Sequence, residues 1–154
     1  MPVFTKFWKH PANGNSDQVQ LTERGPVLQV EIAIPETLAK LYAEKNLPIP
    51  QPKTGFALID TGASGTCVDA ECLNSLQINP IGECPISTPS GTSVQTIHPC
   101  KISFPGTPIG TLEFNSVIAT ELKNQGIIAL LGRDILQHFI IIYNGVEGMW
   151  TLTY

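Results

Sequence analysis

The sequence predicts a mainly β fold with one or two short helices. Apolar and polar residues alternate from Pro26 to Ile34, as in a half-buried strand. Short apolar runs at residues 56–59 and 127–131 end at turn-forming residues, which is typical of buried strands. Residues 85–97 alternate around a proline and glycine turn, which indicates a hairpin. The length of 154 residues favours one domain with its own core.

The first 24 residues give no definite element. They are polar, and turn-forming residues crowd together at positions 13–17. We therefore assign residues 1–24 to a leader of uncertain order and residues 25–154 to the folded domain. The alternating segment at 26–34 is the first strand of that domain, with its apolar face toward the core.

Two helices are expected after this strand. Residues 35–45 have proline and glutamate in the first turn and place their large apolar residues on one face. The proline-rich tract at 47–52 ends this helix, because proline disfavours helical backbone in the residue before it. A second, shorter helix is expected at 69–76.

The C-terminal third predicts more strands. Residues 101–104 and 110–119 have strand composition and flank a proline and glycine turn. Residues 139–143 and 149–154 form a closing hairpin, with the Asn144-Gly145 pair as its turn signal.

The tripeptide Asp60-Thr61-Gly62 is the most informative part of the chain. It directly follows the apolar run at 56–59 and precedes Ala63, so the carboxylate of Asp60 stands where a buried strand ends. Glycine here allows backbone N–H groups to approach that carboxylate. On its own the tripeptide also fits an ordinary turn, because aspartate and glycine are good turn formers.

A second motif lies downstream. The apolar run at 127–131 ends at Gly132 and continues through Arg133 into a short helix. Together and in this order, the two motifs resemble those of the retropepsin family, the single-lobe aspartic proteases of retroviruses and their cellular and bacterial relatives. The resemblance covers Gly25 to Tyr143 and implies a retropepsin-like closed β-barrel lobe that hydrolyses peptide bonds.

By this resemblance Asp60 is the catalytic residue, and Thr61, Gly62 and Ala63 support the catalytic loop. No other aspartate of the chain is followed by Thr-Gly. One chain therefore supplies one catalytic carboxylate, and the resemblance implies a homodimer with the active site on its two-fold axis. Two copies of Asp60 would hold a water and share one proton, because two adjacent carboxylates do not both ionise easily.

The hairpin expected between 85 and 104 resembles, by its position, the retropepsin flap, a lid that closes over the bound peptide. Its polar tip fits an ordinary surface hairpin equally well, and only its place between the two motifs favours a flap. The flap candidates are Thr88, Pro89, Ser90, Gly91 and Thr92.

Gly132 and Arg133 are expected to be structural. Gly132 would allow close packing under the Asp60 loop, and Arg133 would anchor that loop. Viral enzymes commonly pair this arginine with an acidic residue shortly after Asp-Thr-Gly, but Ser64 and Gly65 occupy that stretch here. The partner of Arg133 is therefore open.

Both ends of the chain depart from the viral pattern. Viral enzymes end in one short strand that interleaves with the N-terminus at the dimer interface. This sequence instead predicts a C-terminal hairpin and a long N-terminal leader. The dimer interface need not be built in the same way.

Composition excludes several other classes. Nine basic and thirteen acidic residues give a net charge of −4, which disfavours a nucleic-acid partner. No apolar run approaches the ~18 residues of a membrane span, and the start has no apolar signal core. We expect a cytoplasmic protein without membrane contact.

The four cysteines of the chain should be reduced, and their spacing matches no zinc site, so no metal or cofactor is expected.

Two alternatives stay open. A thiol–imidazole pair of Cys67 with His98 or His138 is conceivable, although no nucleophile motif surrounds that cysteine. The favoured function is a homodimeric aspartic endopeptidase that cleaves peptide or protein substrates. The alternative is a catalytically silent retropepsin-fold module for peptide binding or dimerisation, because a fold does not guarantee chemistry.

Overall fold

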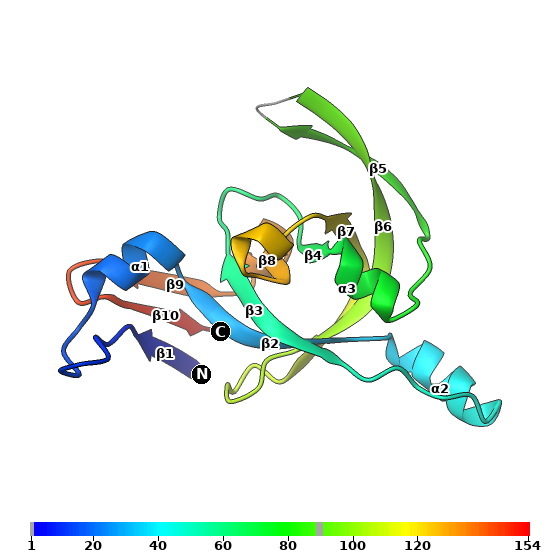
Figure 1. The fold of residues 1–154 in the computed structure, drawn as a ribbon, viewed down its shortest axis with the longest axis horizontal. Helices are drawn as coiled ribbons and strands as arrows, with labels where there is room; N and C mark the ends of the chain where they lie inside the picture. The colour runs from blue at the N-terminus through cyan, green and yellow to red at the C-terminus, as the bar shows by residue number, and fades with distance from the viewer. Residues whose placement is uncertain (1, 89–90) are drawn as a thin grey trace.

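The structure, a computed structural model, describes residues 2–88 and 91–154 (Figure 1). Its elements are β1 (Val3–Phe7), α1 (Gln18–Arg24), β2 (Val27–Ala33), α2 (Glu36–Glu44), β3 (Lys53–Ile59), β4 (Cys67–Asp69), α3 (Ala70–Ser75), β5 (Gly82–Thr88), β6 (Gly91–Ser103), β7 (Thr111–Thr120), the 3-10 helix η1 (Lys123–Gln125), β8 (Ala129–Leu131), α4 (Arg133–Leu136), β9 (Ile140–Asn144) and β10 (Met149–Thr153). The prediction of a mainly β fold is confirmed.

The larger sheet closes on itself. Its strand order is β2-β3-β8-β4-β7-β6-β5 within the described residues, and β2 also pairs with β6, which completes a barrel. The pairs β3–β8 and β4–β7 are parallel, whereas β4–β8 and β6–β7 are antiparallel. Short parallel strands in the centre bring the exit of β3 beside the exit of β8, which is where the two sequence motifs lie.

The core fills the inside of this barrel. The alternation predicted for the first strand is confirmed, because Leu28, Val30 and Ile32 of β2 are buried. Ile102 of β6 and Val117 of β7 pack into the same cluster. Burial of such side chains contributes roughly 1.5–3 kcal/mol each, so the barrel supplies much of the stability that positions the site.

The strand β6 is longer and more bent than expected. Residues 101–104 were predicted as a separate strand, but 101–103 are the end of β6. Pro99 has no N–H to donate, and the register with β7 shifts between His98 and Cys100. The outer half of β6 leaves the barrel there and arches away with β5 as a long hairpin (Figure 1).

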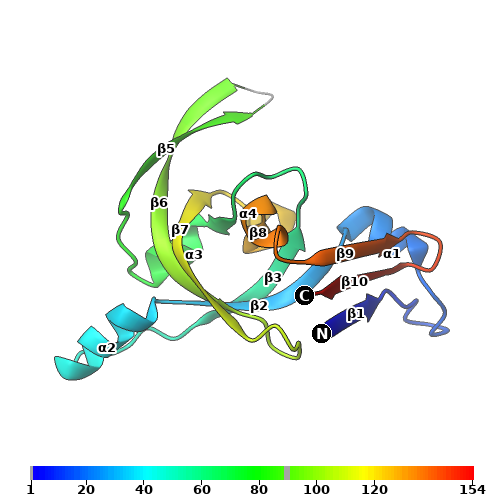
Figure 2. The same cartoon turned by 180° about the vertical axis from the view of Figure 1, so that it is seen from behind.

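A smaller sheet joins the two ends of the chain in the order β1-β10-β9. The predicted closing hairpin is confirmed as β9 and β10. One face of this sheet packs on the core through the buried side chains of Trp150 and Leu152. The first 24 residues, whose order the sequence left open, contain β1 and α1. Figure 2 shows both beside β9 and β10.

The two helices predicted between β2 and β5 are present as α2 and α3. Glu36 lies in the first turn of α2 as predicted, whereas Pro35 is the residue before the helix and not part of that turn. Figure 1 shows α2 projecting from the barrel, and α3 starts at the buried carboxylate of Asp69. No helix among the residues that the structure describes combines the length and apolarity that a bilayer span requires.

Candidate active site

The loop that contains Asp60 begins where β3 leaves the barrel. Ile59 is buried, and its N–H donates to the carbonyl of Pro26 at 3.0 Å. The N–H of Asp60 donates to the carbonyl of Leu131 at 3.0 Å, which continues the β3–β8 ladder by one residue. The position of Asp60 is therefore fixed by two neighbouring strands of the barrel.

The carboxylate of Asp60 is half-buried and has few partners. Its Oδ1 accepts a hydrogen bond of 2.8 Å from the N–H of Gly62. A Cβ added at Gly62 would lie 3.0 Å from that same oxygen, so glycine suits the close approach. The other oxygen, Oδ2, accepts no hydrogen bond from residues 2–88 and 91–154. Thr61 and Gly62 are exposed, so this side of the loop is open.

Arg133 holds the backbone of the loop. Its Nη1 donates to the carbonyls of Thr61 at 2.8 Å and Gly62 at 3.1 Å, and its own N–H donates to the carbonyl of Ala63 at 2.9 Å. The partner that the sequence left open is therefore a pair of carbonyl groups. The guanidinium orients the loop without binding the carboxylate of Asp60.

Gly132 lies directly beneath the same loop. A Cβ at this position would stand 2.5 Å from the carbonyl carbon and oxygen of Gly65, closer than real Cβ contacts allow. The loop and the start of α4 can approach this closely only with glycine at position 132.

Thr66 and Asp134 join the two motifs, and neither is among the site residues predicted from the sequence. The carboxylate of Asp134 accepts from the N–H of Thr66 at 2.9 Å and from its hydroxyl at 2.8 Å. The hydroxyl of Thr66 in turn accepts from the N–H of Gly132 at 3.2 Å. The signal in the sequence was Asp134 itself, a carboxylate directly after Arg133, but its partner is 68 residues away.

The structure thus brings Asp60, Thr61, Gly62 and Ala63 together with Gly132 and Arg133. Of the flap candidates, Thr88, Gly91 and Thr92 lie apart from this group, at the far end of the β5–β6 pairing. Thr88 pairs with Gly91 and Ser87 pairs with Thr92, while Pro89 and Ser90 lie outside the described residues. In Figure 1 the hairpin bends back over the side of the barrel that carries the loop after β3.

The geometry does not support the thiol–imidazole alternative. Burial, and then the carboxylates of Asp134 and Asp60, raise the pKa of the Cys67 thiol to about 11, which disfavours a thiolate nucleophile at neutral pH. The imidazole of His98 is bonded instead to the carbonyl of Ile78 and the hydroxyl of Thr96. No hydrogen bond links Cys67 to a histidine within the part of the chain that the structure describes.

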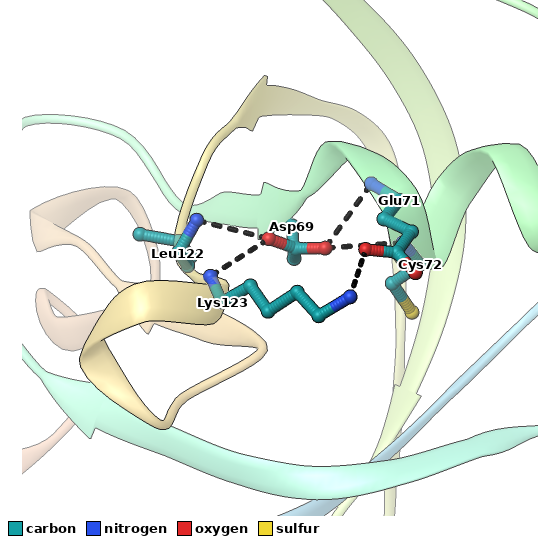
Figure 3. A network of polar contacts seen from close by, with 5 residues as sticks. All are labelled: Asp69, Glu71, Cys72, Leu122 and Lys123. Carbon is teal, nitrogen blue, oxygen red and sulfur yellow. Dashed lines mark hydrogen bonds and ion pairs between the residues drawn. The ribbon is translucent and has the colours of Figure 1, made fainter.

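A second aspartate, Asp69, lies at the start of α3 and is structural (Figure 3). Its Oδ1 accepts from the N–H groups of Glu71 and Cys72, and its Oδ2 accepts from those of Leu122 and Lys123, at 2.9–3.2 Å. Asp69 is 5% exposed, and its hydrogen bonds leave little capacity for a ligand. The described histidine, cysteine and acidic residues form no group placed to hold a metal ion.

Comparison with known proteins identifies the family. The model of the family described as gag-polyprotein putative aspartyl protease matches residues 52–138, which is more than half of the chain and includes both motifs. No curated protein matches the sequence significantly.

Two solved structures show a distant likeness, each at 20% identity and a TM-score of 0.46. The first is the solution structure of simian foamy virus (mac) protease, with 73% of this chain and 92% of that chain covered. The second is the foamy viral protease-reverse transcriptase in complex with an RNA/DNA hybrid, with 75% of this chain and 12% of that chain covered.

Proposed function

Because this chain belongs to the gag-polyprotein putative aspartyl protease family, we propose that it is an aspartic endopeptidase that hydrolyses bonds of peptide or protein substrates. The main support is the carboxylate of Asp60. It stands at the exit of β3, one oxygen binds Gly62, and the other has no partner in the described chain. Such an open carboxylate can bind and activate a water.

The active form in this proposal is a homodimer. Aspartic chemistry of this type needs two carboxylates around one water, and the sequence holds a single Asp-Thr-Gly. The exposed side of the loop at Thr61 and Gly62 supports a symmetric contact in which each subunit meets the same loop of its partner. The hydroxyl of Thr61 would then reach the partner's backbone and hold the two loops in register.

The proposed chemistry follows from two equivalent carboxylates. They share one proton, because repulsion between adjacent negative charges disfavours ionisation of both. The ionised Asp60 takes a proton from the water as it attacks the scissile carbonyl. The protonated copy donates to the carbonyl oxygen and later helps to protonate the leaving nitrogen. The arginine bonds to the loop carbonyls keep both carboxylates oriented throughout.

We further propose that the β5–β6 hairpin is the flap. Its strands pair continuously from Gly82↔Ile97 to Thr88↔Gly91, so the hairpin is long enough to extend well beyond the barrel. The bend at the bulge between His98 and Cys100 directs it back toward the loop (Figure 1). Closure over a bound peptide would exclude water and add backbone hydrogen bonds to the substrate.

The variant Asp60→Asn tests the enzyme proposal. It keeps the size of the side chain and the acceptor for Gly62 but removes the charge, so cleavage of a peptide mixture should fall at least about a thousandfold. Glu121→Gln, which removes a carboxylate from an exposed residue, is the matched control and should cleave normally. Equal turnover by wild type and Asp60→Asn would contradict the proposal. Absence of any cleavage by the wild type would favour the silent binding module.

Mixing the chains tests the composite site. When an equal amount of Asp60→Asn is exchanged into wild-type protein, half of the wild-type chains acquire an inactive partner. The activity per wild-type chain should therefore fall to about half. A monomeric enzyme would keep its full activity, and this result would overturn the homodimer while leaving Asp60 as the catalytic residue.

A further inference from the structure

A pocket lies on the same side of β3 as the carboxylate of Asp60. Side chains of a strand alternate between its faces, and Ala57 and Ile59 point into the core. Leu58 and Phe56 therefore point outward, on the face that continues to Asp60. Both line a pocket of about 620 Å³. Residues two apart on one face are spaced by about 7 Å, and an extended substrate rises about 3.3 Å per residue, so the pocket begins roughly two substrate residues from the carboxylate.

The opposite wall of the pocket comes from the leader. Lys6 of β1 lies on the strand face that packs toward the barrel, and its Nζ donates to the carbonyl of Val27 at 3.0 Å. Trp8 follows β1, and its indole N–H donates to the carbonyl of Gly25 at 3.4 Å. Arg24 ends α1 and lines the same pocket. The first 24 residues thus help to build a pocket beside the candidate active site.

The ring of Trp8 contacts two cations, those of Lys6 and Arg24. The ammonium of Lys6 lies 4.5 Å from the ring centroid, and the guanidinium carbon of Arg24 lies 5.6 Å from it. The Lys6 ammonium is also 5.8 Å from the ring of Phe56, on the wall formed by β3. Both charges are therefore positioned by aromatic contacts rather than by acidic partners.

Neither cation is neutralised within the described chain. Among the described residues, 2–88 and 91–154, the ion pairs are Lys101–Glu36 and Lys123–Glu71. Glu23 also lines the pocket, but its carboxylate is in salt-bridge contact with neither Lys6 nor Arg24. Burial, and then the charge of Arg24, lower the pKa of Lys6. An anion between the two cations would relieve this repulsion.

We propose that this pocket binds the carboxylate of an acidic substrate residue, with Lys6 and Arg24 as specificity-determining residues. The inference rests on the proposed protease function and assigns its substrate class. Phe56 and Leu58 form an apolar wall for the methylene groups of the acidic side chain. The longer side chain of glutamate covers more of this wall than aspartate, so glutamate is the preferred occupant.

Cleavage profiling tests the assignment. Peptides with blocked ends carry glutamate, glutamine or lysine at each position around the cleavage site, and kcat/KM is compared. At one position the wild type should prefer glutamate over glutamine by about tenfold or more, the scale of a hydrogen bond to a charged group. Lys6→Met and Arg24→Gln should each lose most of that ratio, and Lys6→Arg should retain most of it.

The matched control is Lys9→Met, which removes a positive charge from the same segment outside the pocket lining. Its ratio of glutamate to glutamine cleavage should equal that of the wild type. An unchanged ratio in Arg24→Gln, whose side chain is exposed, would overturn the proposal even if Lys6→Met failed to fold. A wild type without any acidic preference would overturn it as well.

A binding measurement separates this inference from the protease proposal. The Asp60→Asn protein is titrated with a glutamate peptide whose ends are blocked, and the indole N–H signals of its two tryptophans are followed by NMR. The Trp8 signal should shift, while the signal of fully buried Trp150 should not. A shift only with peptides that have a free C-terminal carboxylate would contradict the assignment to an acidic side chain. A Trp8 shift without catalysis by the wild type would refute the enzyme alone.

Discussion

Asp60 and Asp69 are nine residues apart and both stand where a strand ends: Asp60 directly follows β3, and Asp69 is the last residue of β4. Their environments differ. Asp69 is buried, and its two oxygens accept four backbone N–H groups. Asp60 is half-buried and accepts one. A carboxylate whose oxygens accept all their hydrogen bonds within the fold stabilises the structure. A carboxylate with an oxygen that accepts none is available to bind a water or a substrate.

The neighbouring cations sharpen this difference. Near Asp60 the guanidinium of Arg133 binds the carbonyls of Thr61 and Gly62, so the loop is anchored while the carboxylate stays accessible. Near Asp69 the ammonium of Lys123 pairs with Glu71 at 2.7 Å across the outside of the network. In both places the charged group of the cationic side chain binds a neighbour of the aspartate and not the oxygens of the aspartate itself.

The largest expected effect on stability is that of Asp69→Ala. The change leaves up to four backbone N–H groups without their acceptor, and each unsatisfied buried group costs about 1–3 kcal/mol, less where water can enter. The free energy of unfolding should fall by roughly 3–5 kcal/mol in urea titrations. Asp69→Asn should lose less, because its amide oxygen still accepts from one side of the network.

Asp60→Ala is the matched control for this prediction. It removes a single bond to the exposed Gly62, which water can replace, so the stability should change by less than about 1 kcal/mol. An equal loss in the free energy of unfolding for Asp60→Ala and Asp69→Ala would contradict the distinction between a structural and an accessible carboxylate.

The sequence was sufficient for those features that depend on local patterns. Alternation predicted β2, the proline and glutamate at positions 35 and 36 predicted the start of α2 to within one residue, and Asn144-Gly145 predicted the turn between β9 and β10. The two motifs, in their order along the chain, indicated the family, and the match of the family model supports this independently. Each of these signals lies within a few neighbouring residues, where propensity and turn chemistry determine the backbone.

Features that depend on distant partners could not be predicted. The polar leader gave no sign that β1 would pair with β10 at the other end of the chain. Nothing near Asp69 indicated that residues 122 and 123 would donate to it. The cationic pocket needs Lys6, Arg24 and Phe56 from three elements. Such contacts depend on how the barrel closes, and a single sequence contains no local signal for that.

Gly132→Ala should have a smaller effect than Asp69→Ala but act on both stability and activity. The added Cβ would meet the backbone of Gly65 at 2.5 Å, so the loop or α4 must shift. Overpacking of this kind typically costs about 1–3 kcal/mol. The displaced loop should also lower kcat/KM for peptide cleavage.

Gly145→Ala is the control, because its nearest contact would be Tyr143 at an ordinary 3.6 Å. An unchanged melting temperature in Gly132→Ala would show that the two motifs are not tightly packed.

The effect that is smallest near neutral pH, where it vanishes, concerns two buried thiols that matter only at alkaline pH. Burial raises the pKa of Cys72 to about 11 and of Cys100 to about 12, against an ordinary value of 9.0. Above pH 9 the unfolded chain releases these protons while the folded chain retains them, so stability is full below pH 9 and falls toward pH 11. Each thiol contributes at most about 1.4 kcal/mol per pH unit to this fall. Urea titrations at several pH values should therefore give a shallower decline for Cys72→Ala and Cys100→Ala than for the wild type. Identical slopes would contradict thiol burial as the cause, because other ionising groups are shared by all three proteins.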